Sequence, residues 1–232
     1  AILKLGNLYL EGKGVKQDYL MAKKYYELLA KYNYSEGINN LGYLYLEGKG
    51  VKQDYTMAKN YFELSAKQGN SKALLCLGNL YFHGQGVEQS YLEAKKYYEL
   101  SAKQNNSDAI HNLGNLYNCG QGVQKDINKA KELYEIAAKQ NNPHSFLQLG
   151  IIYEKGNVGP KDFLRAKKFY EMSAEQNNSL AYIRLAMLYR NGYGVSQDFQ
   201  KMKEYIVKAV DLRNSSAIVL LGDAYFHGIG VE

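Results

Sequence analysis

The sequence predicts an all-α protein, a solenoid of antiparallel helix pairs with a period of 36 residues. A Gly-x-Gly-Val turn and then an aspartate or serine recur at fixed positions in most of these periods. A unit of this size is too small to bury its own apolar face, so such units stack on one another and share a core. The dipeptide Leu-Gly sets the register, with Leu185-Ala186 in one position and the other copies at Leu5-Gly6, Leu41-Gly42, Leu77-Gly78, Leu113-Gly114, Leu149-Gly150 and Leu221-Gly222.

Each repeat opens with a predicted amphipathic helix. In residues 1–11, the apolar side chains of Ile2, Leu5, Leu8 and Tyr9 follow the spacing of one helical face. The glycine of the Leu-Gly dipeptide stands in the middle of this helix, where glycine is less favourable than alanine by about 1 kcal/mol. We therefore expect the second helix of the repeat to come so close that no Cβ fits at this position.

A glycine turn ends the first helix. In Gly12-Lys13-Gly14-Val15 the first glycine suits the left-handed residue that closes a helix, and the second allows the chain to reverse tightly. The fifth repeat departs from this order, with Gly156 and Gly159 set differently. The remaining copies of the turn begin at Gly48, Gly84, Gly120, Gly192 and Gly228.

The second helix of each repeat begins after an N-cap residue, and in the first repeat we expect it over residues 19–32. The N-caps, whose side-chain oxygens accept from free amides of the first turn, are Asp18, Asp54, Ser90, Asp126, Asp162 and Asp198. The helical spacing places the many tyrosines of this helix in the core. One position carries lysine (Lys23, Lys59, Lys95, Lys131, Lys167 and Lys203), and glutamate follows four residues later (Glu27, Glu63, Glu99, Glu135 and Glu171). This spacing predicts solvated ion pairs.

We expect one repeat domain over residues 1–232, with repeats at about 1–36, 37–72, 73–108, 109–144, 145–180 and 181–216 and a partial repeat at 217–232. The chain starts inside a helix and stops within a repeat, which suggests a fragment of a longer chain. No apolar run is long enough to span a membrane. Cys76 and Cys119 lie too far apart on their helices for a disulfide. Free thiols favour the cytoplasm, and secretion or delivery to a host cell is the alternative if a targeting segment has been removed.

The pattern Ala-x-x-x-Leu-Gly-x-x-Tyr-x-x-Gly-x-Gly-Val, read from Ala73 through Val87 and followed by Ala94 and Tyr98, resembles the Sel1-like repeat. That family is related to tetratricopeptide repeat proteins and has a longer, glycine-bearing turn. The resemblance covers the whole chain. It implies a right-handed superhelical fold. It also implies a function as a scaffold or adaptor of protein complexes, without catalysis and without a cofactor.

The resemblance to tetratricopeptide arrays also implies where a partner binds. Apart from the core positions, the third, fourth, seventh, tenth and eleventh positions of each first helix share one side, which we call the first-helix face, and which lines the concave side of such arrays. Its candidate binding residues are Asn7, Glu11, Asn39, Tyr43, Glu47, Asn79, His83, His111, Asn115, Asn118, Ile151, Arg184, Met187 and Arg190.

Asparagine recurs at one position of this face, in Asn7, Asn79 and Asn115. A carboxamide is both donor and acceptor, so a ladder of carboxamides can hold the backbone of an extended peptide. We therefore expect a protein or peptide ligand on the first-helix face. The alternative is that asparagine is only a neutral surface residue in a chain rich in lysine, asparagine and tyrosine. A second partner that the architecture allows is another copy of the chain, joined end to end through apolar faces.

Two other classes of function fit less well. The net charge of +6 and the isoelectric point of about 9.0 bring nucleic acid into consideration. Many lysines, however, are placed for ion pairs with glutamate, so we expect no nucleic-acid partner. The four histidines are scattered and do not combine with cysteine or carboxylate at ligand spacing, so neither a metal site nor an enzyme is expected. One branch of the resembling family, with paired cysteines, has reported hydrolase-like or antibiotic-binding activity, and this chain lacks those pairs.

Overall fold

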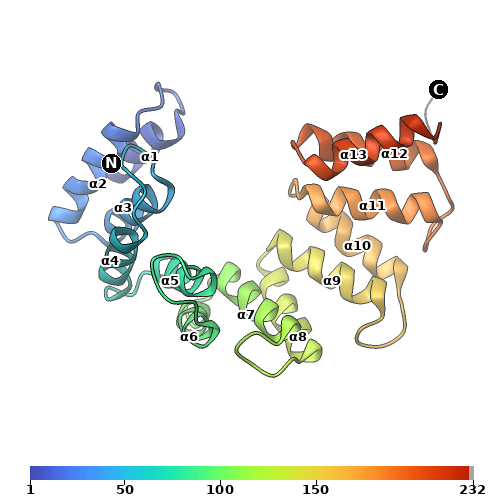
Figure 1. Ribbon diagram of the computed structural model, residues 1–232, viewed down its shortest axis with the longest axis horizontal. Coiled ribbons are helices and arrows are strands. Elements are labelled where there is room, and N and C mark those ends of the chain that lie inside the picture. Colours follow the sequence, from blue (N-terminus) through green and yellow to red (C-terminus); the bar gives the residue numbers. More distant parts are fainter. Residues whose placement is uncertain (230–232) are drawn as a thin grey trace. The chain divides into compact units, whose positions relative to one another are not determined.

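The computed structural model describes residues 1–229, and this part of the chain contains thirteen α-helices and no strand (Figure 1). The first helices of the repeats are α1 (Ile2–Glu11), α3 (Ser35–Glu47), α5 (Ser71–His83), α7 (Ser107–Cys119), α9 (Pro143–Lys155), α11 (Ser179–Asn191) and α13 (Ser215–Phe226). The second helices are α2 (Tyr19–Lys31), α4 (Tyr55–Ala66), α6 (Tyr91–Ala102), α8 (Ile127–Lys139), α10 (Phe163–Ala174) and α12 (Phe199–Asp211). The predicted all-α solenoid of antiparallel helix pairs is confirmed.

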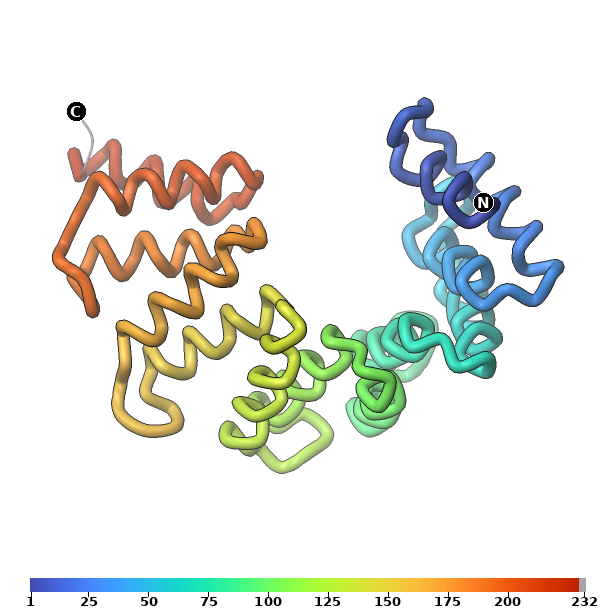
Figure 2. Tube along the Cα trace, turned by 180° about the vertical axis from the view of Figure 1, so that it is seen from behind, coloured from blue at the N-terminus to red at the C-terminus, as the bar shows by residue number. Residues whose placement is uncertain are grey.

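The helices form two compact units, and each is described by itself. Unit 1 comprises residues 1–116 and 120–124, with α1 to α6 and most of α7. Unit 2 comprises residues 117–119 and the described chain from residue 125, with α8 to α13. The helices from α1 to α6 in unit 1 and from α8 to α13 in unit 2 each pack on the next one along the chain. Figure 2 shows the chain reversing its direction at the turns.

Both ends of the helices have the predicted chemistry. The Asp54 carboxylate accepts a hydrogen bond from the Met57 backbone amide at 2.9 Å, and each of the six expected N-caps makes such a bond. At the other end, Gly48 closes α3 in the left-handed region with φ of 67°. The last turn begins at Gly228, whose φ is 61°, and its expected residues Gly230 and Val231 lie outside the described residues.

The second glycine of the turn has a packing role that the sequence did not reveal. A Cβ added to Gly86 would lie 2.6 Å from Cβ of Tyr55, the first residue of α4 in the preceding repeat. Gly50 makes the same close approach to Tyr19. This glycine therefore lets the turn of one repeat rest on the start of the second helix before it, in addition to adopting a positive φ.

The glycine in the middle of the first helix faces an aromatic ring. A Cβ on Gly78 would lie 2.4 Å from Cε1 of Tyr98, and a Cβ on Gly42 would lie 2.5 Å from Cε1 of Phe62. The predicted close approach is confirmed, and the close group is the ring of a buried side chain. In the sixth repeat, Ala186 replaces this glycine and the smaller Ile206 stands at the position of Tyr98, and both are buried in one core cluster.

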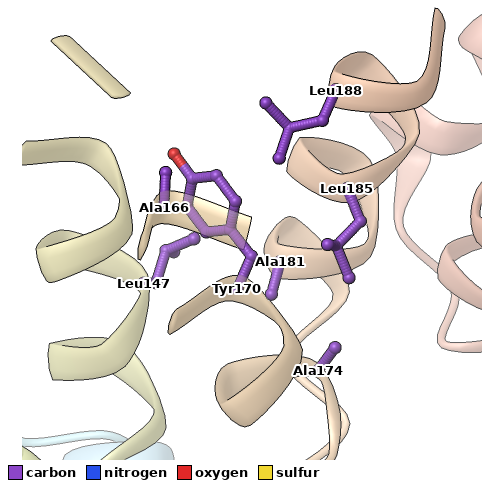
Figure 3. Packing of buried hydrophobic residues seen from close by; sticks show 7 residues of the cluster. All are labelled: Leu147, Ala166, Tyr170, Ala174, Ala181, Leu185 and Leu188. Carbon is purple, nitrogen blue, oxygen red and sulfur yellow. The ribbon is translucent and has the colours of Figure 1, made fainter. Parts of the chain in front are cut away.

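The tyrosines of the second helices pack in two ways. Those equivalent to Tyr98 are buried, whereas their neighbours stack on the first helix. Tyr81 and Tyr97 stack with ring centroids 5.5 Å apart, and Tyr45 and Tyr61 do the same. In unit 2, the ring of Tyr170 lies between Leu147 of α9 and Leu185 of α11 (Figure 3).

The first helices from α5 onward have N-caps that we did not predict. Asn70, Asn106, Asn142, Asn178 and Asn214 accept hydrogen bonds from backbone amides of the first turn. The known preference of asparagine for this position is the signal that could have identified them.

The charged surface follows the expected ladder. Lys59 lies 2.6 Å from Glu63, and the equivalent pairs lie between 2.6 and 3.6 Å apart. None of the described helices is both long enough and apolar enough to cross a membrane.

Candidate partner-binding face

The exposed part of the first-helix face in unit 1 lies mainly at the ends of the helices. Glu11, Glu47 and His83 occupy the eleventh position and are exposed, as is Tyr43 halfway along α3. Glu11 pairs with Lys13 at 2.7 Å, and Glu47 lies 3.9 Å from a lysine of its own turn. The two carboxylates are therefore paired only with lysines of their own turns, and all four side chains are exposed.

Two asparagines of this face are hydrogen-bonded to buried tyrosines. Oδ1 of Asn79 accepts a hydrogen bond from the Tyr98 hydroxyl at 2.8 Å and a second from Nδ2 of Asn112 at 3.2 Å. The same two distances recur in the first repeat, among Asn7, Tyr26 and Asn40. Each asparagine thus uses its carbonyl oxygen inside the protein. Within residues 1–229, the Nδ2 donors of Asn7 and Asn79 have no partner.

The second repeat has different residues at the positions equivalent to Asn79, Tyr98 and Asn112. Tyr43 stands where the others have asparagine, and Phe62 stands where they have tyrosine. The Cys76 thiol donates to the Tyr43 hydroxyl at 3.0 Å, and the rings of Tyr43 and Phe62 meet edge to face at 5.5 Å. In this repeat the residue in the asparagine position therefore matches the chemistry of the ring below it.

Asn39 and His111 lie in the interior. Both occupy the third position of a first helix, and their exposed fractions are 2% and 9%. The third position is buried in α5 as well, at Leu75, because neighbouring helices cover it. Nδ2 of Asn39 lies 3.5 Å from Oδ1 of Asn40, and His111 Nε2 lies 3.0 Å from Nδ2 of Asn115. Asn115 is thus tied to a buried histidine.

In unit 2, Glu154 takes over the role of the asparagine. Ile151 occupies the asparagine position and has no polar atom, so the Tyr170 hydroxyl donates to the Glu154 carboxylate one turn further along α9. Nη1 of Arg184 lies 3.7 Å from the same carboxylate. Figure 3 shows the hydroxyl of Tyr170 at the end of the ring that points away from Ala174. Glu154 and Arg184 occupy the tenth and the fourth position of their helices, so both lie at positions predicted for this face.

The remaining candidates of unit 2 are partly exposed. Met187 and Arg190 lie on α11 and line a small hollow together with residues of α12 and α13. Asn118 lies near the end of α7. No hydrogen bond joins these three side chains to one another.

Burial keeps the polar groups under this face neutral. It raises the pKa of Tyr26 to about 12, although the neighbouring Asn40 carboxamide acts in the opposite direction. Burial also raises the pKa of Tyr98 and that of Tyr170 above the usual range. The Cys76 thiol, its pKa raised to about 12 by burial, stays protonated and is a poor nucleophile.

The described residues contain no group of three or more His, Cys, Asp or Glu side chains that could hold a metal ion. What this face offers to a partner is hydrogen-bond donors, two carboxylates at helix ends and exposed tyrosine and histidine side chains.

Comparison with solved structures gives relatives of the same architecture. A crystal structure from uropathogenic Escherichia coli, described as a protective antigen with an SLR fold, is 33% identical with a TM-score of 0.72. That match covers 97% of this chain and 49% of the other, so this chain spans about half the length of that relative. A Sel1 repeat protein from Oxalobacter formigenes is 31% identical with a TM-score of 0.84, covering 91% of this chain and 86% of the other. A Klebsiella pneumoniae protein described as a sel1 repeat protein, at 19% identity and a TM-score of 0.61, shares the fold over 87% of this chain and 98% of its own.

No curated protein matches the chain significantly. The Sel1 repeat family model matches residues 1–31, 35–70, 71–106, 107–142, 147–178, 179–213 and 215–232. With seven matched segments that cover nearly the whole sequence, the chain belongs to the Sel1 repeat family.

Proposed function

We propose that this chain is a non-catalytic scaffold that binds a protein or peptide partner on the first-helix face. The Sel1 repeat family generally binds proteins, which supports the coarse assignment. The observation that supports binding on the first-helix face is the orientation of the Asn7 and Asn79 carboxamides. Their carbonyl oxygens are fixed by two internal hydrogen bonds each, while their Nδ2 donors have no partner in the described part of the chain.

A fixed donor is suited to a backbone carbonyl of a ligand. Because each carboxamide is already held in one rotamer, binding a peptide carbonyl would immobilise little further side-chain freedom. A backbone carbonyl is present in any peptide, so these donors would supply affinity without selecting a sequence. The exposed side chains of Tyr43, Glu47 and His83 lie on the same face and would supply selectivity.

The charge distribution supports protein over nucleic acid as the partner. Five lysines of the second helices lie within 3.6 Å of a glutamate. Paired lysines release few counterions on binding a phosphate backbone, and this release provides most of the affinity of non-specific nucleic-acid binding.

Asn79→Asp tests the proposal because the aspartate keeps an acceptor for Tyr98 and Asn112 and loses the Nδ2 donor. Wild type and variant would be used to capture proteins from a lysate of the source organism, after circular dichroism confirms that both are folded. We expect the captured partner to bind Asn79→Asp about tenfold more weakly, from one lost hydrogen bond and the repulsion between carboxylate and carbonyl.

Asn60→Asp is the matched control, because Asn60 is an exposed asparagine of the second helix α4. It introduces the same charge in unit 1 away from the first-helix face. A partner that binds both variants as tightly as the wild type would remove the first-helix face from the proposal. Capture of nucleic acid in place of protein would contradict the proposal as a whole.

A further inference from the structure

Unit 1 has a second feature suited to binding, formed by its second helices. A hollow of about 640 Å³ is lined by Tyr25, Leu28 and Ala30 of α2, Leu41 of α3 and Tyr61 of α4. Lys24, Glu27 and Lys31 complete its lining. Its floor is therefore apolar, and its charged groups come from one helix.

Leu28, which lines this hollow, occupies a position that carries leucine in three successive repeats. Leu28, Leu64 and Leu100 occupy the same position of α2, α4 and α6, and their exposed fractions are 37%, 45% and 40%. A single exposed leucine on a protein surface is ordinary, whereas leucine at the same exposed position in three successive repeats is a repeated feature of this surface.

The charges around the hollow are not balanced. Glu27 lies 3.0 Å from Lys23, so its charge is already compensated on the same helix. Lys24 and Lys31 form no ion pair within residues 1–229. The hollow therefore combines an apolar floor with two uncompensated positive charges.

We infer that this hollow binds an acidic amphipathic α-helix of a partner protein. An apolar side chain of that helix would enter the hollow beside Leu28 and Tyr61, and its flanking carboxylates would lie near Lys24 and Lys31. Helices docked in apolar grooves present their anchors in this way, at a spacing of three or four residues. A concave hollow takes up a protruding side chain, which favours a helix over the flat surface of an anionic membrane. This site is separate from the first-helix face and does not depend on the function proposed for it.

The test uses a fluorescent peptide of about 14 residues, made of glutamate, alanine and leucine, with its leucines on one helical face. Binding to the complete chain would be followed by fluorescence anisotropy. We expect Leu28→Ser to weaken binding about tenfold, because the exposed third of a leucine side chain loses its contact with the ligand. The double variant Lys24→Glu/Lys31→Glu should weaken it at least as much, and added salt should weaken binding to the wild type.

Leu20→Ser is the matched control, because Leu20 lies on the same helix, is 66% exposed and does not line the hollow. It should bind the peptide like the wild type. The inference is wrong if Leu20→Ser weakens binding as much as Leu28→Ser, or if a peptide with lysine in place of glutamate binds equally well. Flotation of the chain with vesicles containing phosphatidylserine, in the absence of peptide binding, would overturn it in favour of a lipid surface.

Discussion

The hydrogen bonds around Tyr98 yield a sharp test of how the repeats are held together. Tyr98 is 2% exposed, and its hydroxyl donates to Oδ1 of Asn79 at 2.8 Å. Asn79→Ala leaves this buried hydroxyl without its acceptor, which costs about 1–3 kcal/mol of folding free energy. Tyr98→Phe removes the hydroxyl itself and leaves Asn79 bonded to Asn112, so we expect a smaller loss of about 1 kcal/mol.

The double variant Asn79→Ala/Tyr98→Phe decides whether these losses come from the same bond. Because the double variant has no orphaned hydroxyl, its loss should be smaller than the sum of the two single losses by about 1 kcal/mol or more. The assay is urea unfolding followed by circular dichroism, with amide hydrogen exchange to locate the change in α5, α6 and α7. Tyr97→Phe is the control, because Tyr97 stacks on Tyr81 and its hydroxyl donates to no group in the described part of the chain. Strictly additive losses, or a loss for Asn79→Ala no larger than for Tyr97→Phe, would show that the bond between Tyr98 and Asn79 does not stabilise the fold.

Three further predictions concern the backbone, the helix caps and pH. Gly78→Ala should destabilise the fold by about 2 kcal/mol, because its Cβ would overlap a buried ring. Gly222→Ala places no atom within 4 Å of the new Cβ, so it should be neutral or stabilise the fold by up to about 1 kcal/mol. Urea unfolding of both variants compares the two free energies. Asp54→Ala should cost about 1 kcal/mol through the lost N-cap of α4, measured in the same way. Burial raises the pKa of Cys76 and that of Tyr26 to about 12, so the unfolded chain loses these protons first as pH rises. The contribution of these two groups to stability should therefore be fully present below pH about 9 and be lost between about 9 and 12, by at most about 1.4 kcal/mol per pH unit for each group. Unfolding that is insensitive to pH in this window would contradict the assignment.

The repeating elements were predictable from sequence because their causes are local. An N-cap such as Asp54 and a left-handed glycine such as Gly48 act within one turn of the helix that they begin or end, so a pattern of a few residues identifies them. The ion pair between Lys59 and Glu63 follows in the same way from its spacing of four residues.

The internal bonds of the first-helix face were not predictable in this way. Asn79 is 19 residues from Tyr98 and 33 residues from Asn112, and the packing of three helices brings them together. The sequence nevertheless contains a signal, because asparagine at position 79 accompanies tyrosine at 98, whereas tyrosine at 43 accompanies phenylalanine at 62. Recognising it requires knowing that these positions touch.

The same bonds change how the binding hypothesis should be tested. Alanine at position 79 removes a donor from the surface and an acceptor from the interior, so a lost partner could result from either change. Aspartate separates the two effects because it keeps the acceptor.

Nuclear magnetic resonance signals of the asparagine side-chain amides, recorded with and without the captured partner, report directly on the proposed donors. If the partner binds the first-helix face through the proposed donors, the Nδ2 proton signals of Asn7 and Asn79 will shift on binding, and those of Asn60 will not. Shifts at Asn60 with unchanged signals at Asn7 and Asn79 would place the partner on the second helices and contradict the account.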